Sequence, residues 1–376
     1  MCRLFALSSR DPVSPMRAID ALNVMKEGHD GSGVGLFLHG LDGPLGEMKD
    51  APILSGIFTD TGLKRLDTYM DERGFFAKST LVLDPKTKRP AGTPARGTYM
   101  ARAYDVPAAI KALPQAEREL TYMLMRVELR SMGVADEDIR VFSFWPDTVM
   151  VKEVGDPLTV GEYLGLDRPE LYSRHILAQG RQNTNYAINL YACHPFFIQG
   201  VCTMTNGENT AFIPIKEYLE SRGFPGYVGY QSDSEVFTHI MHFTLNRLHL
   251  GIEYYKHIIT PLSNAEMEGH TDRELLGRIK QTCRKLIIDG PNCVIGCLPD
   301  GTMFMVQDRK KLRPGVVGGK SGLFAFSSEI CGLDAAIPDR DPHADFQPMH
   351  LDTAIVRPEC QEVTIWNQLQ SLPRPH

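Results

Sequence analysis

The second residue of the chain constrains its fold and its chemistry more than any other. Removal of the initiator methionine would leave Cys2 at the N-terminus, with both a thiol and a free α-amine. The pKa of an α-amine is ~7.7–8.0 and that of a thiol ~8.5, so the amine can accept the thiol proton at neutral pH. One residue would then supply both nucleophile and base. The apolar run at residues 4–7 leaves a second interpretation open, because it is also typical of an ordinary buried first strand.

The composition indicates a soluble globular protein with neither nucleic acid nor membrane as its main partner. Of the 376 residues, 43% are hydrophobic and 23% charged, which suffices for one large domain or two ordinary ones. The net charge of −6 argues against binding to nucleic acid or an anionic membrane. No apolar run approaches the ~18 residues that span a bilayer. Arg3, Arg10 and Asp11 interrupt any signal-peptide segment, so we expect a cytoplasmic protein.

The cysteine spacing gives no support to a metal centre. None of the eight cysteines forms a C-x-x-C pair, so we expect reduced thiols and neither a zinc ribbon nor an iron–sulfur cluster. Glu235, His239 and His242 fall on one face of an expected helix and could imitate a metal site. Because a fourth ligand is missing, a polar helix face is the favoured interpretation, and we predict no metal.

Hydrophobic periodicity and turn chemistry predict strands at both ends of the chain and helices between them. Expected strands are 2–8, 36–38, 80–83, 99–101, 175–178, 200–205, 293–298, 303–307, 316–317, 323–326, 354–356 and 363–366. Expected helices are 16–26, 115–132, 210–222, 232–250 and one beyond Thr271. This pattern favours an α+β fold with two stacked sheets flanked by helices.

Turn residues add three local expectations. Asp11-Pro12 with Ser14-Pro15 predicts a turn before the first helix. Pro146-Asp147 predicts a hairpin over 140–154, and the Pro-Asp-Gly sequence at 299–301 predicts a second hairpin. We predict one domain over residues 1–376, which carries an insertion at 40–170.

A glycine-rich segment at residues 28–35 invites comparison with phosphate-binding loops. Its glycines precede a strand and do not open a helix, which is the wrong context for phosphate. We expect a turn whose small residues let the backbone pack closely near the N-terminal nucleophile.

Three polar segments could complete a site around Cys2. The Asn206 side-chain amide and the Gly207 N–H, at the end of an expected strand, can donate to one developing oxyanion, although an ordinary Asn-Gly turn fits equally well. Arg181 lies in a polar turn and can bind a carboxylate through two parallel hydrogen bonds, or it is simply a surface arginine. Asp233 can accept a substrate ammonium, or it belongs to a plain helix N-terminus.

In this order, these residues resemble the class II glutamine amidotransferases of the N-terminal-nucleophile superfamily. The closest likeness is to the stand-alone amidotransferase subunits of glutamate-synthase-like and N-methylglutamate-synthase-like enzymes. The segments that carry the resemblance are Met1-Cys2, the Asp-x-x-Gly turn at 29–33, Arg181 with Thr184, the Ala-Cys-His-Pro-Phe segment at 192–196, Asn206-Gly207-Glu208, the Ser-Asp-Ser-Glu segment at 232–235, Asp308-Arg309, Leu312-Arg313-Pro314 and Ser327-Ser328-Glu329.

The resemblance implies a four-layer αββα sandwich and a glutaminase reaction through a Cys2 thioester. It assigns Asn206 and Gly207 to the oxyanion. It also assigns Arg181, Thr184 and Asn185 to the α-carboxylate of L-glutamine, and Asp233 to its α-ammonium. It implies no cofactor in this chain, and an ammonia acceptor in synthase partner subunits that carry FMN and iron–sulfur clusters.

The chain departs from the family pattern around the expected pocket. Gln179 and Gly180 replace a His-Thr or His-Ser pair, Gln182 replaces an aromatic residue, and Thr205 replaces the usual histidine before Asn-Gly. Two other functions therefore stay open. One is an N-terminal-nucleophile amide hydrolase that acts alone on a substrate other than glutamine. The other is a non-catalytic subunit retained for assembly.

Overall fold

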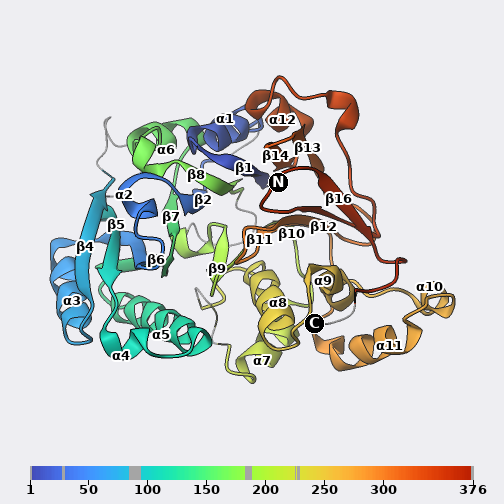
Figure 1. Cartoon of the computed structure of the whole chain (residues 1–376), viewed down its shortest axis with the longest axis horizontal. Helices are drawn as coiled ribbons and strands as arrows, with labels where there is room; N and C mark the ends of the chain where they lie inside the picture. Colours follow the sequence, from blue (N-terminus) through green and yellow to red (C-terminus); the bar gives the residue numbers. More distant parts are fainter. Residues whose placement is uncertain are drawn as a thin grey trace. The chain divides into compact units, whose positions relative to one another are not determined.

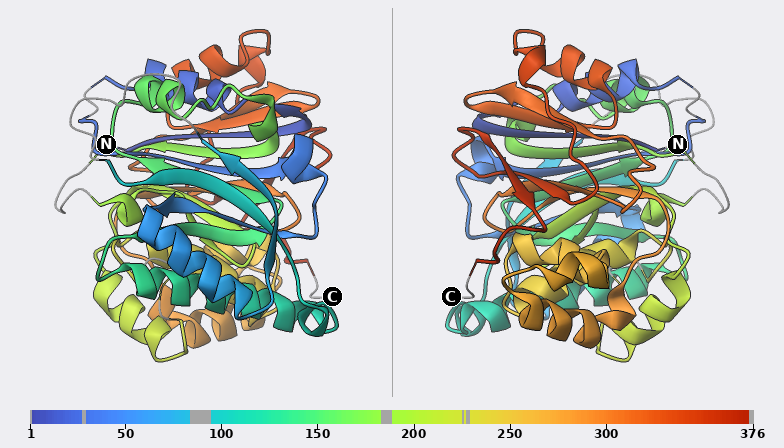
Figure 2. Two further views of the ribbon diagram at one scale, coloured as in Figure 1. Left: turned by 90° about the vertical axis from the view of Figure 1, so that its left-hand side faces the viewer. Right: turned by 90° about the vertical axis from the view of Figure 1, so that its right-hand side faces the viewer.

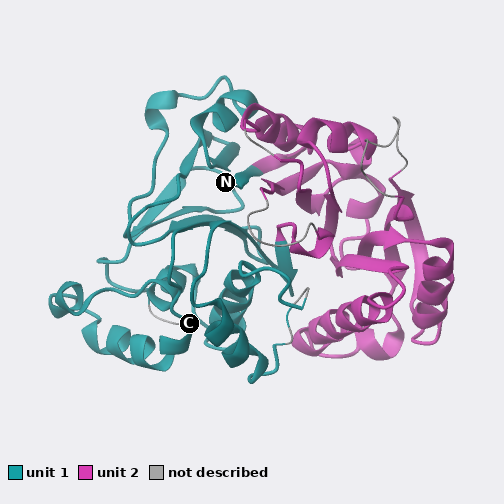
Figure 3. Cartoon of the chain, turned by 180° about the vertical axis from the view of Figure 1, so that it is seen from behind, with its two compact units in different colours: residues 1–8, 196–376 teal, residues 9–195 magenta. Residues whose placement is uncertain are grey.

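The computed structural model describes residues 2–27, 30–83, 95–182, 189–224, 226 and 229–373. The chain forms two compact units (Figures 1 and 3). Unit 1 contains Met1–Ser8 and Phe196–His376, and unit 2 contains Ser9–Pro195. Both units combine helices with antiparallel strand pairs, which confirms the predicted mixture of helices and sheets. The four-layer sandwich and the single domain with an insertion stay predictions. No helix in the described ranges is long and apolar enough to cross a membrane.

Unit 1 is built on a six-stranded antiparallel sheet. Its strand order is β16-β15-β12-β11-β10-β9. These strands are β9 (Phe196–Ile198), β10 (Val201–Gly207), β11 (Asn292–Cys297), β12 (Met303–Gln307), β15 (Asp352–Val356) and β16 (Val363–Asn367). The predicted hairpin around the Pro-Asp-Gly turn is confirmed, because β11 pairs with β12 and the Asp300 carboxylate accepts the Thr302 N–H at 2.9 Å.

Helices of unit 1 cover one face of this sheet (Figure 2, yellow to orange). Ile240 and Tyr255 from the helices pack in one core cluster with Val294 and Phe304 from the strands, and all four are buried. The burial of this apolar face is the main stabilising contribution that the cluster makes. The helices are α7 (Phe212–Glu220), α8 (Glu235–Asn246), α9 (Ile252–Ile259), α10 (Asn264–Glu268) and α11 (Arg273–Thr282).

The predicted helix over 232–250 is shorter in the structure. It begins at Glu235, so its N-cap residue is Ser234 and not Ser232; the Ser234 side chain makes no capping hydrogen bond, and Ser232 Oγ accepts the Ser234 N–H at 3.3 Å. It ends at Asn246, and His249 then adopts a left-handed conformation with φ of 54°. A left-handed residue breaks the helical path, and α9 starts three residues later.

One further hairpin and one further helix of unit 1 lie next to the start of the chain in sequence or in hydrogen bonding. The hairpin of β13 (Val316–Lys320) and β14 (Leu323–Ser327) leads into α12 (Ile330–Ala336). The Leu4 N–H donates to Ser328 Oγ at 2.9 Å, and the Ser328 N–H donates to the Leu4 carbonyl at 2.9 Å. The first residues of β1 (Arg3–Val13) are therefore held by the segment that follows β14.

Unit 2 begins within the same strand. The strand continues through Asp11-Pro12 to Val13, so the turn predicted at 11–15 is wrong in its first half. Pro12 is the penultimate residue of the strand. The strands β8 (Ser173–Gly180), β2 (Val34–Leu41) and β7 (Thr148–Glu153) follow one another in the sheet in that order. Unit 2 also contains the helices α1 (Met16–Val24), α2 (Gly43–Gly46) and α6 (Pro157–Tyr163).

A second sheet of unit 2 comes from the predicted insertion. Its order is β4-β5-β3-β6. It contains β3 (Pro52–Phe58), β4 (Phe76–Val82), β5 (Thr98–Asp105) and β6 (Ile139–Pro146), with α3 (Asp60–Asp71), α4 (Ala108–Lys111) and α5 (Gln115–Gly133). In the left view of Figure 2, α3 and α5 (blue to blue-green) lie on one side of these strands.

The hairpin predicted over 140–154 does not form. The two strands are present, but β6 pairs with β3 and β7 pairs with β2, in different sheets. Asp147 between them has φ of 51°, and its carboxylate accepts the Leu41 N–H at 2.8 Å. This contact ties the turn to β2, so the chain leaves one sheet and enters the other.

Candidate active site

The predicted oxyanion pair lies at the end of β10. The Asn206 side chain is only 3% exposed, and Asn206 and Gly207 face Cys293 and Asn292 across the β10–β11 pair. A Cβ atom on Gly207 would lie 2.1 Å from the Pro291 carbonyl oxygen, which is closer than any real contact. Only glycine fits at this close approach of two backbones.

Asp233 lies against the turn that follows this pair. Its carboxylate accepts the Asn209 N–H at 2.8 Å, and its other oxygen accepts a hydrogen bond from Ser234 Oγ at 3.4 Å. Burial raises the pKa of the Asp233 carboxyl, and the neighbouring charge of Glu208 adds to the rise. A cation at this carboxylate would offset both effects. The structure thus brings together two of the predicted site segments within unit 1.

Backbone hydrogen bonds and a side-chain ion pair hold the start of the chain in place. Cys2 is half-buried. The next residue, Arg3, forms an ion pair with Glu329 at 2.9 Å, in addition to the two hydrogen bonds between Leu4 and Ser328. Residues 327–329 were part of the resemblance, and in the structure they hold the strand that begins directly after Cys2.

Arg181 lies in unit 2, directly after β8. Its side chain is 6% exposed, and its Nη1 donates to the Asn189 carbonyl at 3.4 Å. Its backbone N–H donates to the Gly33 carbonyl at 2.7 Å, and its own carbonyl accepts a hydrogen bond from Ser32 Oγ at 2.9 Å. It is a buried arginine, so the interpretation as a surface residue is wrong. Thr184 and Asn185 lie outside the described residues.

The glycine turn packs closely, as expected, but its contacts within unit 2 are with a different cysteine. A Cβ atom on Gly33 would lie 2.3 Å from Cys193 Sγ. On Gly35 it would lie 1.8 Å from the His194 carbonyl oxygen. Of the segment 28–35, Gly28 and His29 lie outside the described residues.

Sequence reasoning missed a buried polar cluster next to this turn. Lys152 and Glu153 are both 0% exposed, although they lie in an otherwise apolar strand. Lys152 Nζ donates to the Cys193 carbonyl at 2.5 Å, and the His194 N–H donates to the Gln179 side chain at 3.1 Å. Burial lowers the pKa of His194, and the charges of Arg181 and Lys152 lower it further. Two adjacent charges inside an apolar strand were the signal that could have revealed this cluster.

On the helix face that could imitate a metal site, the Glu235 carboxylate already forms hydrogen bonds within the protein. Glu235 Oε1 lies 3.1 Å from His239 Nε2, and Glu235 Oε2 accepts the Tyr230 N–H at 2.9 Å. Burial lowers the pKa of His242 to about 3, so its ring is neutral. No group of three metal-ligating side chains occurs in the ranges that the structure describes.

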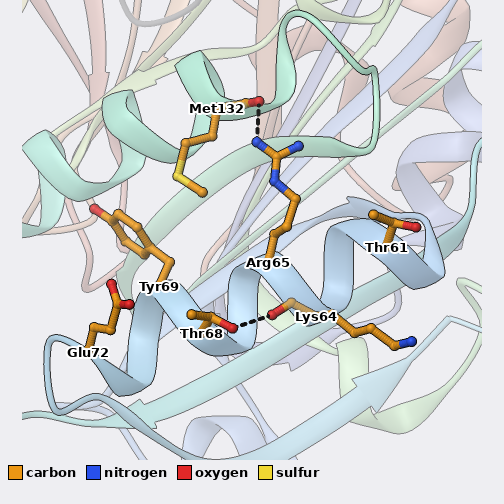
Figure 4. Close-up of a pocket in the computed structure, with 7 residues that line it drawn as sticks. All are labelled: Thr61, Lys64, Arg65, Thr68, Tyr69, Glu72 and Met132. Carbon is orange, nitrogen blue, oxygen red and sulfur yellow. Dashed lines mark hydrogen bonds between the residues drawn. The ribbon is translucent and has the colours of Figure 1, made fainter.

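A cavity of about 340 Å³ on unit 2 contains none of the predicted site residues (Figure 4). Residues of α3 form most of its wall, and Met132 of α5 completes it. Two of its polar side chains already have partners: Arg65 Nη2 donates to the Met132 carbonyl at 3.0 Å, and Tyr69 Oη donates to Glu128 at 2.6 Å. None of the residues proposed as nucleophile or oxyanion donor lies in this cavity.

Comparisons with known proteins show only distant similarity. No family model matches the chain. An uncharacterized protein from Archaeoglobus fulgidus is 26% identical over 379 residues, which cover 99% of this chain and 96% of that protein.

Three solved structures are also similar to this chain. The glutamine phosphoribosylpyrophosphate amidotransferase from B. subtilis, complexed with ADP and GMP, matches 99% of this chain at 11% identity and a TM-score of 0.44. A structure described as the allosteric regulatory enzyme of purine biosynthesis matches 97% at 11% identity and a TM-score of 0.46. This chain spans about half of each, namely 50% and 49%. A glutamine aminotransferase class-II domain protein from Silicibacter pomeroyi matches 90% of this chain over its full length, at 12% identity and a TM-score of 0.31. Similarity at this level does not assign a function, so the chemistry of the chain's own residues has to carry the assignment.

Proposed function

We propose that the chain is a class II glutamine amidotransferase subunit that hydrolyses L-glutamine to glutamate and ammonia. The observation that carries this proposal is the hydrogen bond from Asn209 to Asp233, which holds a half-buried carboxylate at the turn after Asn206-Gly207. An acceptor for an ammonium and two donors for an oxyanion therefore occur on neighbouring segments of unit 1.

In the proposed reaction, the Cys2 thiolate attacks the side-chain amide carbon of glutamine. The Asn206 amide and the Gly207 N–H stabilise the tetrahedral oxyanion. The C–N bond breaks, nitrogen leaves as ammonia with the proton first taken from the thiol, and a thioester remains on Cys2. The Cys2 α-amine then activates a water that hydrolyses the thioester to glutamate and restores the thiol.

Substrate selection in this proposal depends on the two charged groups of the amino acid. Asp233 binds the α-ammonium. We further propose that Arg181, with Thr184 and Asn185, binds the α-carboxylate, as the resemblance implies. The burial of Arg181 supports a role in recognition, because a buried guanidinium strongly penalises a substrate that leaves it unpaired.

The partners belong to the same proposal. We propose that ammonia passes to a synthase subunit of a glutamate-synthase-like complex in the cytoplasm, where FMN and iron–sulfur clusters would reside. This chain would need no cofactor of its own, since the thiol, the amine and the oxyanion donors supply the chemistry. The four-layer sandwich belongs to this proposal as well.

Intact mass of the purified full chain tests the nucleophile. We expect the mass to lack one methionine and to increase by a single adduct with 6-diazo-5-oxo-L-norleucine, which loses N₂ when a thiolate attacks it. The matched variants are Cys2→Ser and Cys331→Ser, since among the described cysteines only Cys2 and Cys331 are not buried.

The adduct should disappear in the Cys2→Ser variant and persist in the Cys331→Ser variant. Retention of Met1 with no adduct would favour the non-catalytic assembly subunit. An adduct without equal release of glutamate and ammonia from glutamine would favour an amide hydrolase with another substrate.

A further inference from the structure

The turn that carries Gly207 rests on the segment just before β11. The Glu208 N–H donates to the Pro291 carbonyl at 3.0 Å. The two segments also approach each other closely at two glycines. A Cβ atom on Gly207 would lie 2.1 Å from the Pro291 carbonyl oxygen, and one on Gly290 would lie 2.3 Å from the Glu208 carbonyl oxygen. Because the contact has no slack, a displacement of residues 290–292 is passed on to Gly207.

The same contact sets the direction of the Gly207 N–H. Successive N–H groups of a strand in an antiparallel pair point to opposite sides. The Glu208 N–H points to β11, so the Gly207 N–H points away from β11, toward the side on which β9 pairs only with residues 201–203. The position of this donor therefore depends on the backbone of residues 291–292 behind it.

A buried carboxylate fixes Asn292, the residue that faces Gly207 in the β10–β11 pair. Asp308 is 6% exposed and directly follows β12. Its N–H donates to the Asn292 carbonyl at 2.9 Å, which continues the ladder between β11 and β12 by one step. Its own carbonyl accepts the Lys311 N–H of a turn, and its carboxylate accepts the Asn292 N–H at 3.0 Å. The side chain thus replaces the main-chain acceptor that the turn has taken away.

Other hydrogen bonds hold this carboxylate in one orientation. The oxygen that accepts the Asn292 N–H also accepts the Leu312 N–H at 3.1 Å, and the other oxygen accepts the Lys310 N–H at 2.8 Å. Hydrogen bonds to a charged acceptor are stronger than those between neutral groups, and a buried N–H without an acceptor is costly. Loss of the carboxylate should therefore release the first residue of β11.

We propose that Asp308 is a positioning residue that holds the Gly207 N–H at the oxyanion through the backbone of residues 291–292. This inference rests on the proposed glutaminase reaction and adds to it a residue that does not touch the substrate. An oxyanion donor acts chiefly in the transition state, so its displacement should lower kcat and leave KM almost unchanged.

Ammonia release from glutamine by the full chain tests this role. Asp308→Ala should lower kcat at least about tenfold and leave KM within about threefold. Asp308→Asn keeps an oxygen for the Asn292 N–H, so its kcat should stay within about threefold of the unmodified value. Asp308→Glu keeps the charge but moves the oxygens by one methylene, so it should also lower kcat. That variant keeps the test valid if Asp308→Ala does not fold.

The matched control is Asp300→Ala, at the opposite end of the same two strands. The Asp300 carboxylate also holds a turn, because it accepts the Thr302 N–H and the Thr302 hydroxyl, both at 2.9 Å. This control should lower the melting temperature and leave kcat and KM unchanged. An equal fall in kcat for Asp300→Ala and Asp308→Ala, a change confined to KM, or an unchanged kcat in Asp308→Ala would each overturn the proposal.

Hydrogen exchange separates this inference from the glutaminase proposal. If the unmodified chain does not turn over glutamine, the glutaminase proposal fails, and exchange of the Glu208 amide still tests the link from Asp308 to the turn. We expect exchange at least about tenfold faster in Asp308→Ala than in Asp300→Ala, since a hydrogen bond to a charged group accounts for about one decade or more. Equal exchange rates would show that Asp308 does not hold the turn in place.

Discussion

Two residues near the end of β10 limit the chemistry that is possible there. Gly207 has no room for a side chain, because Pro291 closes the space in which a Cβ atom would lie. The carboxylate of Asp233 is half-buried and accepts the Asn209 N–H, so it is oriented toward the segment that contains Asn206. Each of these two features makes a separate prediction at the residue scale.

Gly207→Ala should reduce glutamine turnover by about 10²–10³-fold, because the added Cβ displaces the N–H that we assign to the oxyanion. Steady-state ammonia release measures the effect. The control is Gly277→Ala in α11, where a Cβ meets nothing within 4 Å. That variant should keep its rate and gain up to about 1 kcal/mol of stability, since alanine favours a helix over glycine. Equal rates for the two variants would contradict the role of Gly207.

Asp233→Asn keeps an oxygen for the Asn209 N–H and removes the charge. We expect KM for glutamine to rise about 10–100-fold, because a charge-assisted contact to the substrate ammonium is lost.

The same variant should change the pH dependence of stability. The folded-state pKa of Asp233 is raised, so the native state binds the proton more tightly, and the contribution to stability is lost as pH rises through the pKa. Without ligand, Asp233→Asn should therefore gain in melting temperature relative to the unmodified chain between pH 4 and pH 8. A gap that shrinks with rising pH would contradict this sign.

Strands with strong turn chemistry could be predicted from the sequence, and strands without it could not be paired. The hairpin of β11 and β12 follows from the Pro-Asp-Gly turn, which selects the neighbouring strand as the partner. The strands β6 and β7 were found, but β7 is buried along its whole length. A strand that is covered on both faces shows no alternation, so its sequence does not reveal the sheet to which it belongs.

The residues of the candidate site also differ in how far the local sequence reveals them. The sequence singles out Asn206 and Asp233 because one lies near the end of β10 and the other just before α8, and their roles in glutamine binding stay predictions. Lys152 and Glu153 lie inside a strand and were missed, since their partners come from distant segments such as Cys193 and Arg96. A buried charge depends on contacts that local patterns do not contain.

Lys256 couples α9 to the central sheet of unit 1 and should make stability depend on alkaline pH. Its Nζ donates to the carbonyls of Gln307 and Asp352 at 3.0 Å each. Burial lowers its pKa to about 8 from the ordinary value of 10.5.

Between these two pH values the unfolded chain binds a proton that the folded chain does not, so this group makes stability rise with pH. The rise should amount to about 3 kcal/mol. Urea denaturation at pH 7.5, 9 and 10.5 should show this rise in the unmodified chain and in Lys64→Met, an exposed control, but not in Lys256→Met. An identical pH profile for Lys256→Met would show that this ammonium is not the cause.

The whole chain is organised so that unit 1 is discontinuous. Residues 9–195 form unit 2, while the first eight residues belong with 196–376. The N-terminal strand is therefore part of the unit that contains Asn206 and Asp233, although it is separated from them along the chain by nearly two hundred residues.

This organisation predicts how fragments of the protein behave. A fragment of residues 196–376 lacks the strand that pairs with Ser328, so its urea midpoint should be clearly lower than that of a fragment preceded by residues 1–8 and a flexible linker of about 15 residues. Replacement of residues 4–7 by serine in the linked fragment is the control and should return the midpoint to that of the short one. Equal midpoints for all three would show that the strand contributes nothing to unit 1.

The hydrogen bonds between Leu4 and Ser328 can form only late in the synthesis of the chain. These two residues are 324 positions apart. At about 5–20 residues per second, a ribosome needs roughly 16–65 s to deliver the second after the first. During that interval the leading segment lacks its hydrogen bonds to Ser328, and an aminopeptidase that trims methionine can reach it. Processing of Cys2, the proposed nucleophile, would thus be complete before Ser328 holds the strand that follows it.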